Sequence, residues 1–496
     1  MRSVLAAVIL GFVAVFSASA EDAPEPTRSL SLDDCVQMAL NHNLDVQIQR
    51  INPVIDRFTL ESSRGSYDPT WSSTIDESFR KSDVQIDPRF GIPTGGDETT
   101  TEFGSTGIGG VLPYSGLTYD ISTSINRNTG NRFIGELYSI TTGASLTQPL
   151  LKNLWIDAPR RAIQVGRRNV NISELRLKSA VIDVITLVER AYYDLIFAGK
   201  NVEVQQQSLA LAEQLLADNK KRVEVGTMAP LEEMQAQAQV AARKADLISS
   251  LQTLGTQQNT LKNLLTDDFL AWSEVRIQPT ETLIAVEGNF DKQTSWRKGI
   301  AMRPDLLLLK EDLEKQNIEV RYSHNQLFPA LDLVGSYRQI GLDSNFRDSA
   351  GESFSGNNPS YSFGARLTIP LGNRTARNRF RATKAVKQQA ILRLKQSEQN
   401  IIVEIDNAIK TAQSNYRRVE ATREARKYAE AALDAEEKKL ANGASTSFVV
   451  LQLQKDLTDA RSSELRSLAD YNKSLADLAK SEGTTLEKKK LSLDLE

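Results

Sequence analysis

The sequence has few residues of the kinds that build reactive sites. Among 496 residues there is one cysteine, Cys35, and there are two histidines, His42 and His324. A single cysteine excludes an intramolecular disulfide and the paired ligands of a zinc site. No glycine-rich phosphate loop and no G-x-S-x-G motif occurs either. We therefore expect no enzymatic activity, no metal and no cofactor.

An excess of charge of one sign is also missing, as are long apolar runs. The net charge is −3, which leaves no basic footprint for nucleic acid. Beyond the N-terminus no stretch approaches the roughly 20 apolar residues of a membrane helix. The other architecture that can cross lipid is a closed β-barrel, in which all backbone groups pair between strands.

Residues 1–20 have the pattern of an export signal. A basic Arg2 precedes an apolar run from Val4 to Phe16, and Ala18-Ser19-Ala20 matches the small-residue cleavage pattern. The run is shorter than the roughly 20 residues of a membrane span. We predict a cleaved signal peptide at 1–20. Cys35 then lies too far from the new N-terminus to be a lipidated first residue.

The rest of the chain is internally duplicated. The segment Gly143–Leu150 recurs as Gly364–Leu371 with six of eight positions identical. Two further pairs follow the same order: Leu44-Asp45 with Pro304-Asp305, and Gly226-Thr227 with Gly443-Ala444. We predict two structural repeats, at 21–285 and 286–481, followed by a flexible C-terminal tail at 482–496.

Each repeat has the same expected order of elements. These are a first helix (32–64 and 292–326), a strand region (69–148 and 330–369) and a helical hairpin (158–266 and 374–481). Four prolines mark the junctions between strands and helices, because proline lacks the N–H that a continuing helix needs. They are Pro69, Pro149, Pro329 and Pro370.

The hairpin helices carry apolar residues at alternating steps of three and four. Val181, Val184, Val188, Ala191, Leu195, Ala198 and Val202 show this spacing. It is typical of a coiled-coil seam. A helix of about 65 residues is about 100 Å long, longer than a compact domain requires.

The strand regions alternate between apolar and polar residues. In the second repeat, Tyr361, Phe363, Ala365, Leu367 and Ile369 alternate with Ser362, Gly364, Arg366 and Thr368. A membrane barrel with a wet lumen requires this pattern, and a half-buried soluble sheet produces it too. The pattern alone leaves both readings open.

The number of strands indicates an oligomer. The second repeat supplies two strands, and the first supplies two or four: 70–80, 137–148 and, as an open alternative, 103–112 with 117–127. A bacterial membrane barrel has at least about eight strands. One chain is therefore not enough, and several chains would have to share one barrel.

This layout resembles the TolC family of outer-membrane efflux and secretion channels. The marks are Ser31-Leu32-Asp33-Asp34 with Ala39–Asp45, the Leu-Thr-Gln-Pro-Leu and Leu-Thr-Ile-Pro-Leu pair, and the two glycine hairpins. The resemblance implies a homotrimer in which four strands per chain build a twelve-stranded barrel, and we favour four strands here. It also implies three kinds of partner: a periplasmic adaptor (membrane fusion protein), an inner-membrane pump and outer-membrane lipid.

The resemblance also implies functional positions on the hairpins. Adaptors would dock at the tips, which are Val225, Gly226 and Thr227 in the first repeat and Asn442, Gly443 and Ala444 in the second. Family members carry gate aspartates six and nine residues past the second tip glycine, where this chain has Val449 and Gln452. Glu232 and Glu233 of the first repeat are the remaining candidates for a periplasmic gate.

The expected fold class is mainly α with membrane β-barrel strands, arranged as two repeats in a trimeric α/β-barrel tunnel. The expected function is a passive exit duct of a tripartite efflux or type I secretion system. Its place would be the outer membrane of a Gram-negative bacterium, extending into the periplasm. The alternative is a soluble periplasmic coiled coil that acts as a scaffold or in adhesion.

Overall fold

The computed structural model describes residues 27–94, 96–131 and 135–491, so the predicted signal peptide lies outside the described residues. The chain divides into two compact units. The helical unit comprises Met1–Leu44, Val184–Gly288 and Thr411–Asp477, and the sheet unit comprises Asp45–Asp183, Asn289–Lys410 and Leu478–Glu496. Two long helices, α3 (Ala158–Glu224) and α8 (Arg374–Ala441), contribute to both units.

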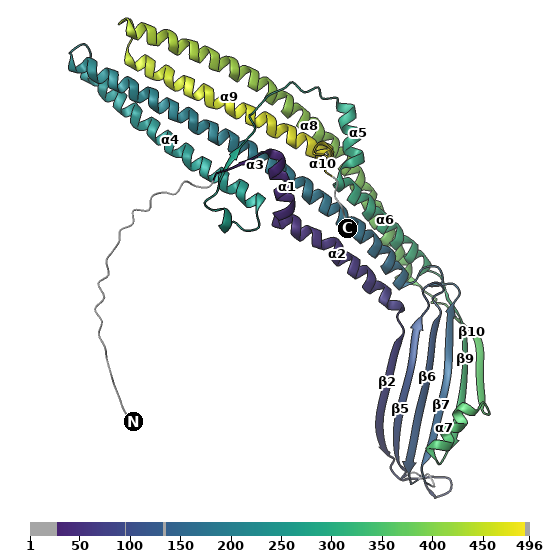
Figure 1. Cartoon of the computed structure of the whole chain (residues 1–496). Coiled ribbons are helices and arrows are strands. Elements are labelled where there is room, and N and C mark those ends of the chain that lie inside the picture. Colours follow the sequence, from purple (N-terminus) through teal and green to yellow (C-terminus); the bar gives the residue numbers. More distant parts are fainter. Residues whose placement is uncertain (1–26, 95, 132–134, 492–496) are drawn as a thin grey trace, which may run out of the picture. The chain divides into compact units, whose positions relative to one another are not determined.

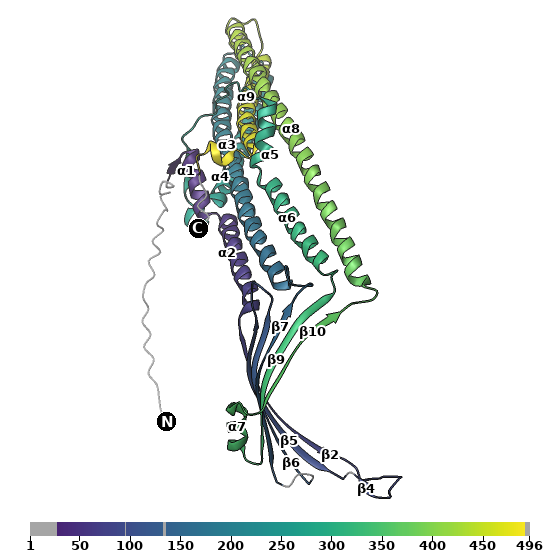
Figure 2. The same cartoon turned by 90° about the vertical axis from the view of Figure 1, so that its right-hand side faces the viewer.

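The sheet unit is built on one antiparallel sheet of six strands, drawn side by side in Figure 1. The strands are β2 (Thr70–Lys81), β5 (Glu98–Val111), β6 (Thr118–Gly130), β7 (Leu137–Pro149), β9 (Ala330–Asp343) and β10 (Pro359–Thr368). Their order is β10-β9-β7-β6-β5-β2, and every neighbouring pair is antiparallel. Figure 2 shows the twist of this sheet along its strands.

Our preference for four strands per chain is wrong. The segments 103–112 and 117–127 form β5 and β6, which lie between β2 and β7 in the sheet. Glycines allow β5 to fit there: a Cβ at Gly107 would lie 2.7 Å from the Ser122 side chain, and one at Gly110 would lie 2.8 Å from the Tyr119 hydroxyl. The same glycines hide the apolar alternation of β5 in the sequence.

The register places the alternating residues of all six strands on two distinct faces. One row of direct cross-strand partners runs Trp71, Ile108, Ile121, Ala144, Tyr337 and Tyr361. Direct partners in an antiparallel pair point to the same side. We call this side the apolar face and the opposite side, which carries Ser122 and Ser362, the polar face.

The first helix of each repeat is interrupted, so the expectation of one continuous helix at 32–64 and at 292–326 is wrong. The first is split into α1 (Leu32–His42) and α2 (Leu44–Arg64), and the second into α5 (Lys292–Met302) and α6 (Pro304–Asn325). Asn43 and Arg303, at the breaks, both have extended backbone.

Different contacts hold the two breaks. The buried Asn43 side chain donates a hydrogen bond to the Leu264 carbonyl at 3.1 Å. Arg303 precedes a proline, which disfavours helical backbone, and its guanidinium binds Glu404 at 2.6 Å. The first cause is a long-range contact, which the local sequence does not reveal.

The helical unit contains α4 (Pro230–Leu265) and most of α9 (Ser447–Glu482), with parts of α3 and α8. Its apolar core near the hairpin tips is formed by Leu215, Leu433, Leu440, Val450, Leu451 and Leu457. The seam residues from Val184 to Val202 are all less than 7% exposed, so the coiled-coil spacing is confirmed as a buried stripe.

Helices α3 and α9 run antiparallel along a line of polar contacts. Ser447 donates to Asn219 at 2.9 Å, Thr458 to Ser208 at 3.0 Å, and Ser462 to Asn201 at 2.8 Å. From one pair to the next the residue number rises along α9 and falls along α3, as expected for antiparallel helices. These hydrogen bonds fix the register of the two helices, because a shift by one residue would break all of them.

Several short elements were not expected from the sequence. They are β1 (Thr27–Leu30), which pairs in parallel with β8 (Arg276–Pro279), β3 (Gln85–Ile86), β4 (Pro93–Thr94), the 3-10 turns η1 (Gly65–Tyr67) and η2 (Leu270–Trp272), and the helices α7 (Phe346–Ser355) and α10 (Thr485–Lys488). The start of the C-terminal tail is therefore not flexible: Thr485 and Leu486 of α10 are buried. Among the described residues, no helix is both long and apolar enough to cross a membrane.

Candidate functional site: the hairpin tips and the two faces of the sheet

The first hairpin tip is a helix C-terminus closed by a Schellman motif. Gly226 has φ 74°, a conformation that favours glycine. Its N–H donates to the Val223 carbonyl at 2.9 Å, and the Thr227 N–H donates to the Arg222 carbonyl at 2.8 Å. A Cβ at Gly226 would meet nothing within 4 Å, so only the backbone angle requires glycine here.

The second tip repeats this geometry. Gly443 has φ 73°, its N–H donates to the Leu440 carbonyl at 3.1 Å, and the Ala444 N–H donates to the Lys439 carbonyl at 2.9 Å. Asn442 donates from its side chain to the Lys438 carbonyl at 2.9 Å. The duplication seen in the sequence therefore extends to the individual hydrogen bonds of the two turns.

Within the helical unit the two tips lie next to each other. The Ser447 hydroxyl, which binds Asn219, also lies 3.9 Å from the sulfur of Met228 in the first tip. Five apolar side chains around the tips are exposed: Val225, Leu231, Met234, Phe448 and Val449. The sequence analysis did not identify these exposed side chains, because they come from the turn after α3 and from α4 and α9, which are far apart in the chain.

A charged group also holds the second tip. Glu436 accepts hydrogen bonds from Lys439 at 2.8 Å and from the Ser445 hydroxyl at 2.5 Å. These two contacts, led by Lys439, hold the pKa of the Glu436 carboxyl below its usual value. The carboxylate therefore stays charged to lower pH and ties the end of α8 to the turn that follows.

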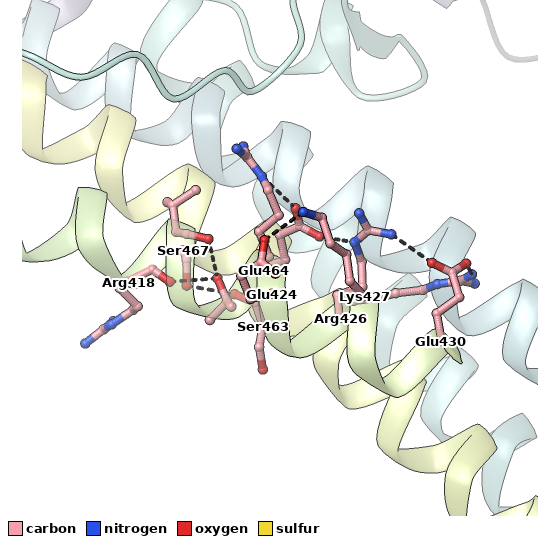
Figure 3. Close-up of polar contacts among 12 residues, drawn as sticks. Arg418, Glu424, Arg426, Lys427, Glu430, Ser463, Glu464 and Ser467 are labelled. Carbon is pink, nitrogen blue, oxygen red and sulfur yellow. Dashed lines mark hydrogen bonds and ion pairs between the residues drawn. The ribbon is translucent and has the colours of Figure 1, made fainter. Parts of the chain in front are cut away.

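Further from the tips, ion pairs join α8 to α9, as Figure 3 shows. Glu464 of α9 accepts from Arg426 and lies 3.5 Å from Arg423, both on α8. Glu430 of α8 accepts from Arg461 of α9 at 3.0 Å. The Glu464 side chain is only 14% exposed. These pairs stabilise the second hairpin in one register.

The gate candidates lie in the first turn of α4. Glu233 accepts a hydrogen bond from Gln237 at 3.1 Å. One carboxylate oxygen of Glu232 is buried and has no hydrogen-bond partner among the described residues. At the positions of the family's aspartates, Val449 is 38% exposed and Gln452 donates to Asp456 at 2.9 Å.

The four junction prolines stand where helices and strands meet. Pro69 and Pro329 come directly before β2 and β9, Pro149 is the last residue of β7, and Pro370 follows two residues after β10. Proline can occupy these positions because no ladder hydrogen bond is needed from its nitrogen.

The apolar face has a defined length. It extends along β9 from Leu331 to Gly341, and the next row across the sheet is charged, with Glu77, Glu102 and Arg127 as direct partners. Arg127 binds Glu102 at 2.9 Å and Glu136 at 2.5 Å. Ten residues of strand, tilted as in membrane sheets, span about 25 Å, close to the usual height of a lipid-facing band.

In residues 27–94, 96–131 and 135–491 no group of three His, Cys, Asp or Glu side chains could hold a metal ion. Cys35 is buried, and His324 packs between the rings of Phe328 and Phe380 at centroid distances of 5.5 and 5.4 Å. Both side chains take part in packing.

Comparison with known proteins identifies the architecture. The sequence profile described as outer membrane efflux protein matches residues 110–266 and 298–484, more than half of the chain. The chain belongs to the outer membrane efflux protein family. It is an outer-membrane channel of the TolC family, and its place is the outer membrane of a Gram-negative bacterium, extending into the periplasm.

Individual relatives agree with this assignment. The outer membrane protein TolC of Vibrio cholerae is 23% identical over 439 residues, which cover 84% of this chain and 92% of the relative. Two solved structures share the fold: the Campylobacter jejuni CmeC outer membrane channel (TM-score 0.68, 16% identity, 92% of this chain and 86% of that chain) and VceC of Vibrio cholerae (TM-score 0.66, 16% identity, 91% and 96%). The expected fold class, mainly α with β-strands in the fold of this channel family, is confirmed.

Proposed function

We propose that this efflux channel works as a homotrimer, and that a periplasmic adaptor and an inner-membrane pump deliver cargo to it. The two repeats, 21–285 and 286–481, would each contribute one helical hairpin to the adaptor-binding end. The channel itself would carry no enzymatic activity, since the family and the fold are those of channels. The family match does not favour a soluble scaffold.

The exposed apolar side chains at the paired tips support adaptor docking most directly. Val225, in the turn directly after α3, is 73% exposed, and Phe448, in the first turn of α9, is 59% exposed. A periplasmic partner with its own apolar surface would cover them, and such burial contributes about 25 cal/mol per Å². The glycine turns hold these side chains at the end of each hairpin.

The test separates docking from folding. The variants Val225→Asp and Phe448→Asp keep both glycine turns, so we expect unchanged trimers by size exclusion but loss of adaptor co-purification and of export. Gly226→Val and Gly443→Val should distort the turns and give the same loss. The control is Gly255→Val, at an exposed α4 position with open space around it. Normal adaptor binding by both aspartate variants would contradict docking at the tips.

We also propose that Glu232 and Glu233 form the periplasmic gate. The partnerless oxygen of Glu232 supports this, because a buried carboxylate without donors is costly unless a neighbouring chain or a passing cation satisfies it. Glu232→Gln should lower the cation selectivity of the purified channel in planar bilayers, while Glu224→Gln, on the other side of the tip, should not. Equal cation selectivity of the unmodified channel, Glu232→Gln and Glu224→Gln would contradict a gate at Glu232.

A further inference from the structure

The two edges of the sheet are open and complementary. β2 and β10 are the edge strands, and β2 is exposed at every position, as is almost all of β10. Since all neighbouring strands are antiparallel and there are six, β2 and β10 run in opposite directions. β10 of one copy can therefore pair antiparallel with β2 of the next, and the same joint can repeat around a ring.

The side chains at these edges match as well. Ile75 of β2 and Phe363 of β10 lie on the apolar face and are 91% and 86% exposed. Joining the edges continues the apolar face from one copy to the next without a change of side. A single copy leaves two unpaired backbone edges, which a lipid environment does not tolerate.

Most side chains of the polar face are small and uncharged, with larger apolar exceptions such as Phe103, Ile340 and Leu342. One representative from each strand is Ser72, Ser105, Ser122, Thr141, Ser336 and Ser362. Its charged residues balance, with three acids (Asp76, Asp120 and Asp332) and three arginines (Arg80, Arg338 and Arg366). No bulky plug and no field of one sign arises from these side chains.

We propose that the sheet end of the assembled channel is wide enough to pass cargo as broad as a small folded domain. This rests on the proposed trimer, in which three six-stranded sheets make a ring of eighteen strands. With strands about 4.8 Å apart and tilted by about 40°, such a ring is about 36 Å across, against about 24 Å for twelve strands. The serine-sized side chains that make up most of this face leave about 28 Å open, and the arginines narrow the opening only where they extend away from the wall.

That opening is sufficient for a compact polypeptide. A folded domain of about 50 residues has a radius of gyration of about 10 Å and is about 25 Å wide. A twelve-stranded ring with the same lining would exclude it. Selection of cargo by size then falls to the helical part of the channel and to its partners, and the sheet adds no restriction of its own.

The test uses a deep cysteine on the polar face. Ser145 is exposed on this face and pairs with Asp120 of β6. From Asp120 to Gly130, at the far end of β6, a tilted strand spans about 25 Å, so a probe that enters from that end must pass about 25 Å into the ring to reach Ser145. The full-length Ser145→Cys oligomer is treated with a small maleimide and with a folded domain of about 50 residues that carries a maleimide on a short linker. Asn357→Cys, in the exposed loop before β10, controls for the reactivity of each probe.

We expect both probes to label Ser145→Cys. The labelling rate of the small maleimide divided by that of the folded domain should agree within about threefold between Ser145→Cys and Asn357→Cys. Native mass spectrometry should give three copies of the chain. Three copies with more than a hundredfold exclusion of the folded domain would overturn the wide opening and leave the trimer intact. A copy number other than three would overturn the proposed assembly itself. The native Cys35 is buried and gives no background.

Discussion

At the scale of single residues, three glycines of this channel are required either by the backbone angle at their position or by a close contact. Gly226 and Gly443 are required by their positive φ alone, and Gly341 is required by space alone. The other scarce residues have packing roles. Cys35 is buried in α1, and His324 contacts the rings of Phe328 and Phe380.

Cys35 gives a prediction at this scale. Burial raises the pKa of its thiol to about 12, so at pH 8 about one molecule in 10⁴ carries the reactive thiolate. We expect no labelling of the native channel by a thiol reagent within hours, and labelling of one thiol per chain after denaturation. Fast labelling of the native protein at pH 8 would show that α1 opens readily.

At the scale of elements, the register of each contact is set by a few polar groups on apolar seams. The ion pairs between α8 and α9 are an example. Replacing Glu464 by glutamine removes the acid through which Arg423 and Arg426 of α8 contact α9. Arg426 is then left with Glu430 of its own helix. We expect the unfolding free energy of this hairpin to fall by about 1–3 kcal/mol, measured by hydrogen exchange along α8 and α9.

The matched control for this variant is Glu424→Gln. Glu424 binds Lys427 on the same helix, and both side chains are more than half exposed. A surface pair of this kind contributes about 0.2–1 kcal/mol at most, so exchange should hardly change. Equal effects of the two substitutions would mean that the α8–α9 pairs do not hold the hairpin together.

The docking of α7 on the sheet depends on one glycine. A Cβ at Gly341 would lie 1.9 Å from the Ser349 carbonyl oxygen, and the Ser349 hydroxyl donates to the Gly341 carbonyl at 2.9 Å. We expect Gly341→Ala to detach α7 and to speed its hydrogen exchange at least tenfold. Gly335→Ala, on the same face of the same strand with open space around it, should leave the exchange of α7 unchanged.

At the scale of the whole molecule, the apolar face gives the most direct test of membrane placement. Phe363 and Leu367 are exposed on this face. Phe363 lies opposite Gly335 near the middle of the face, and Leu367 lies opposite Leu331 at its end. Lysine costs about 2–4 kcal/mol near the membrane centre and about 0–1 kcal/mol near its edges, so the Phe363→Lys, Leu367→Lys double variant should fail to assemble in the outer membrane, mainly because of Phe363→Lys. The double variant Ser360→Lys, Ser362→Lys on the polar face should assemble, as judged by membrane fractionation. Normal assembly of both would place the sheet outside lipid.

How much could be predicted from the sequence depends on the range of the interactions. The hairpins and their tips depend on local patterns, the three–four spacing and glycine after a helix, and they were predicted closely. The break at Asn43 depends on a contact with Leu264, and the docking of α7 depends in part on a contact of Ser349 with the Tyr138 carbonyl. Both partners are distant in the sequence, so no local pattern predicts these two features. The strand count was missed because the family resemblance favoured four strands over the six that 103–112 and 117–127 give, and the glycines of β5 weaken the alternation that marks a strand.

The place of the extra strands has a consequence for how such a chain can grow. Between Pro69 and Pro149 the first repeat carries one more hairpin, β5 and β6, than the second repeat carries between its own prolines. A hairpin adds two strands of opposite direction, so it leaves the directions of both edges as they were. A single added strand would reverse one edge and prevent the antiparallel pairing that we propose between β10 of one copy and β2 of the next. The number of strands per chain must therefore stay even, so a related chain could widen or narrow the pore only by gaining or losing a whole hairpin.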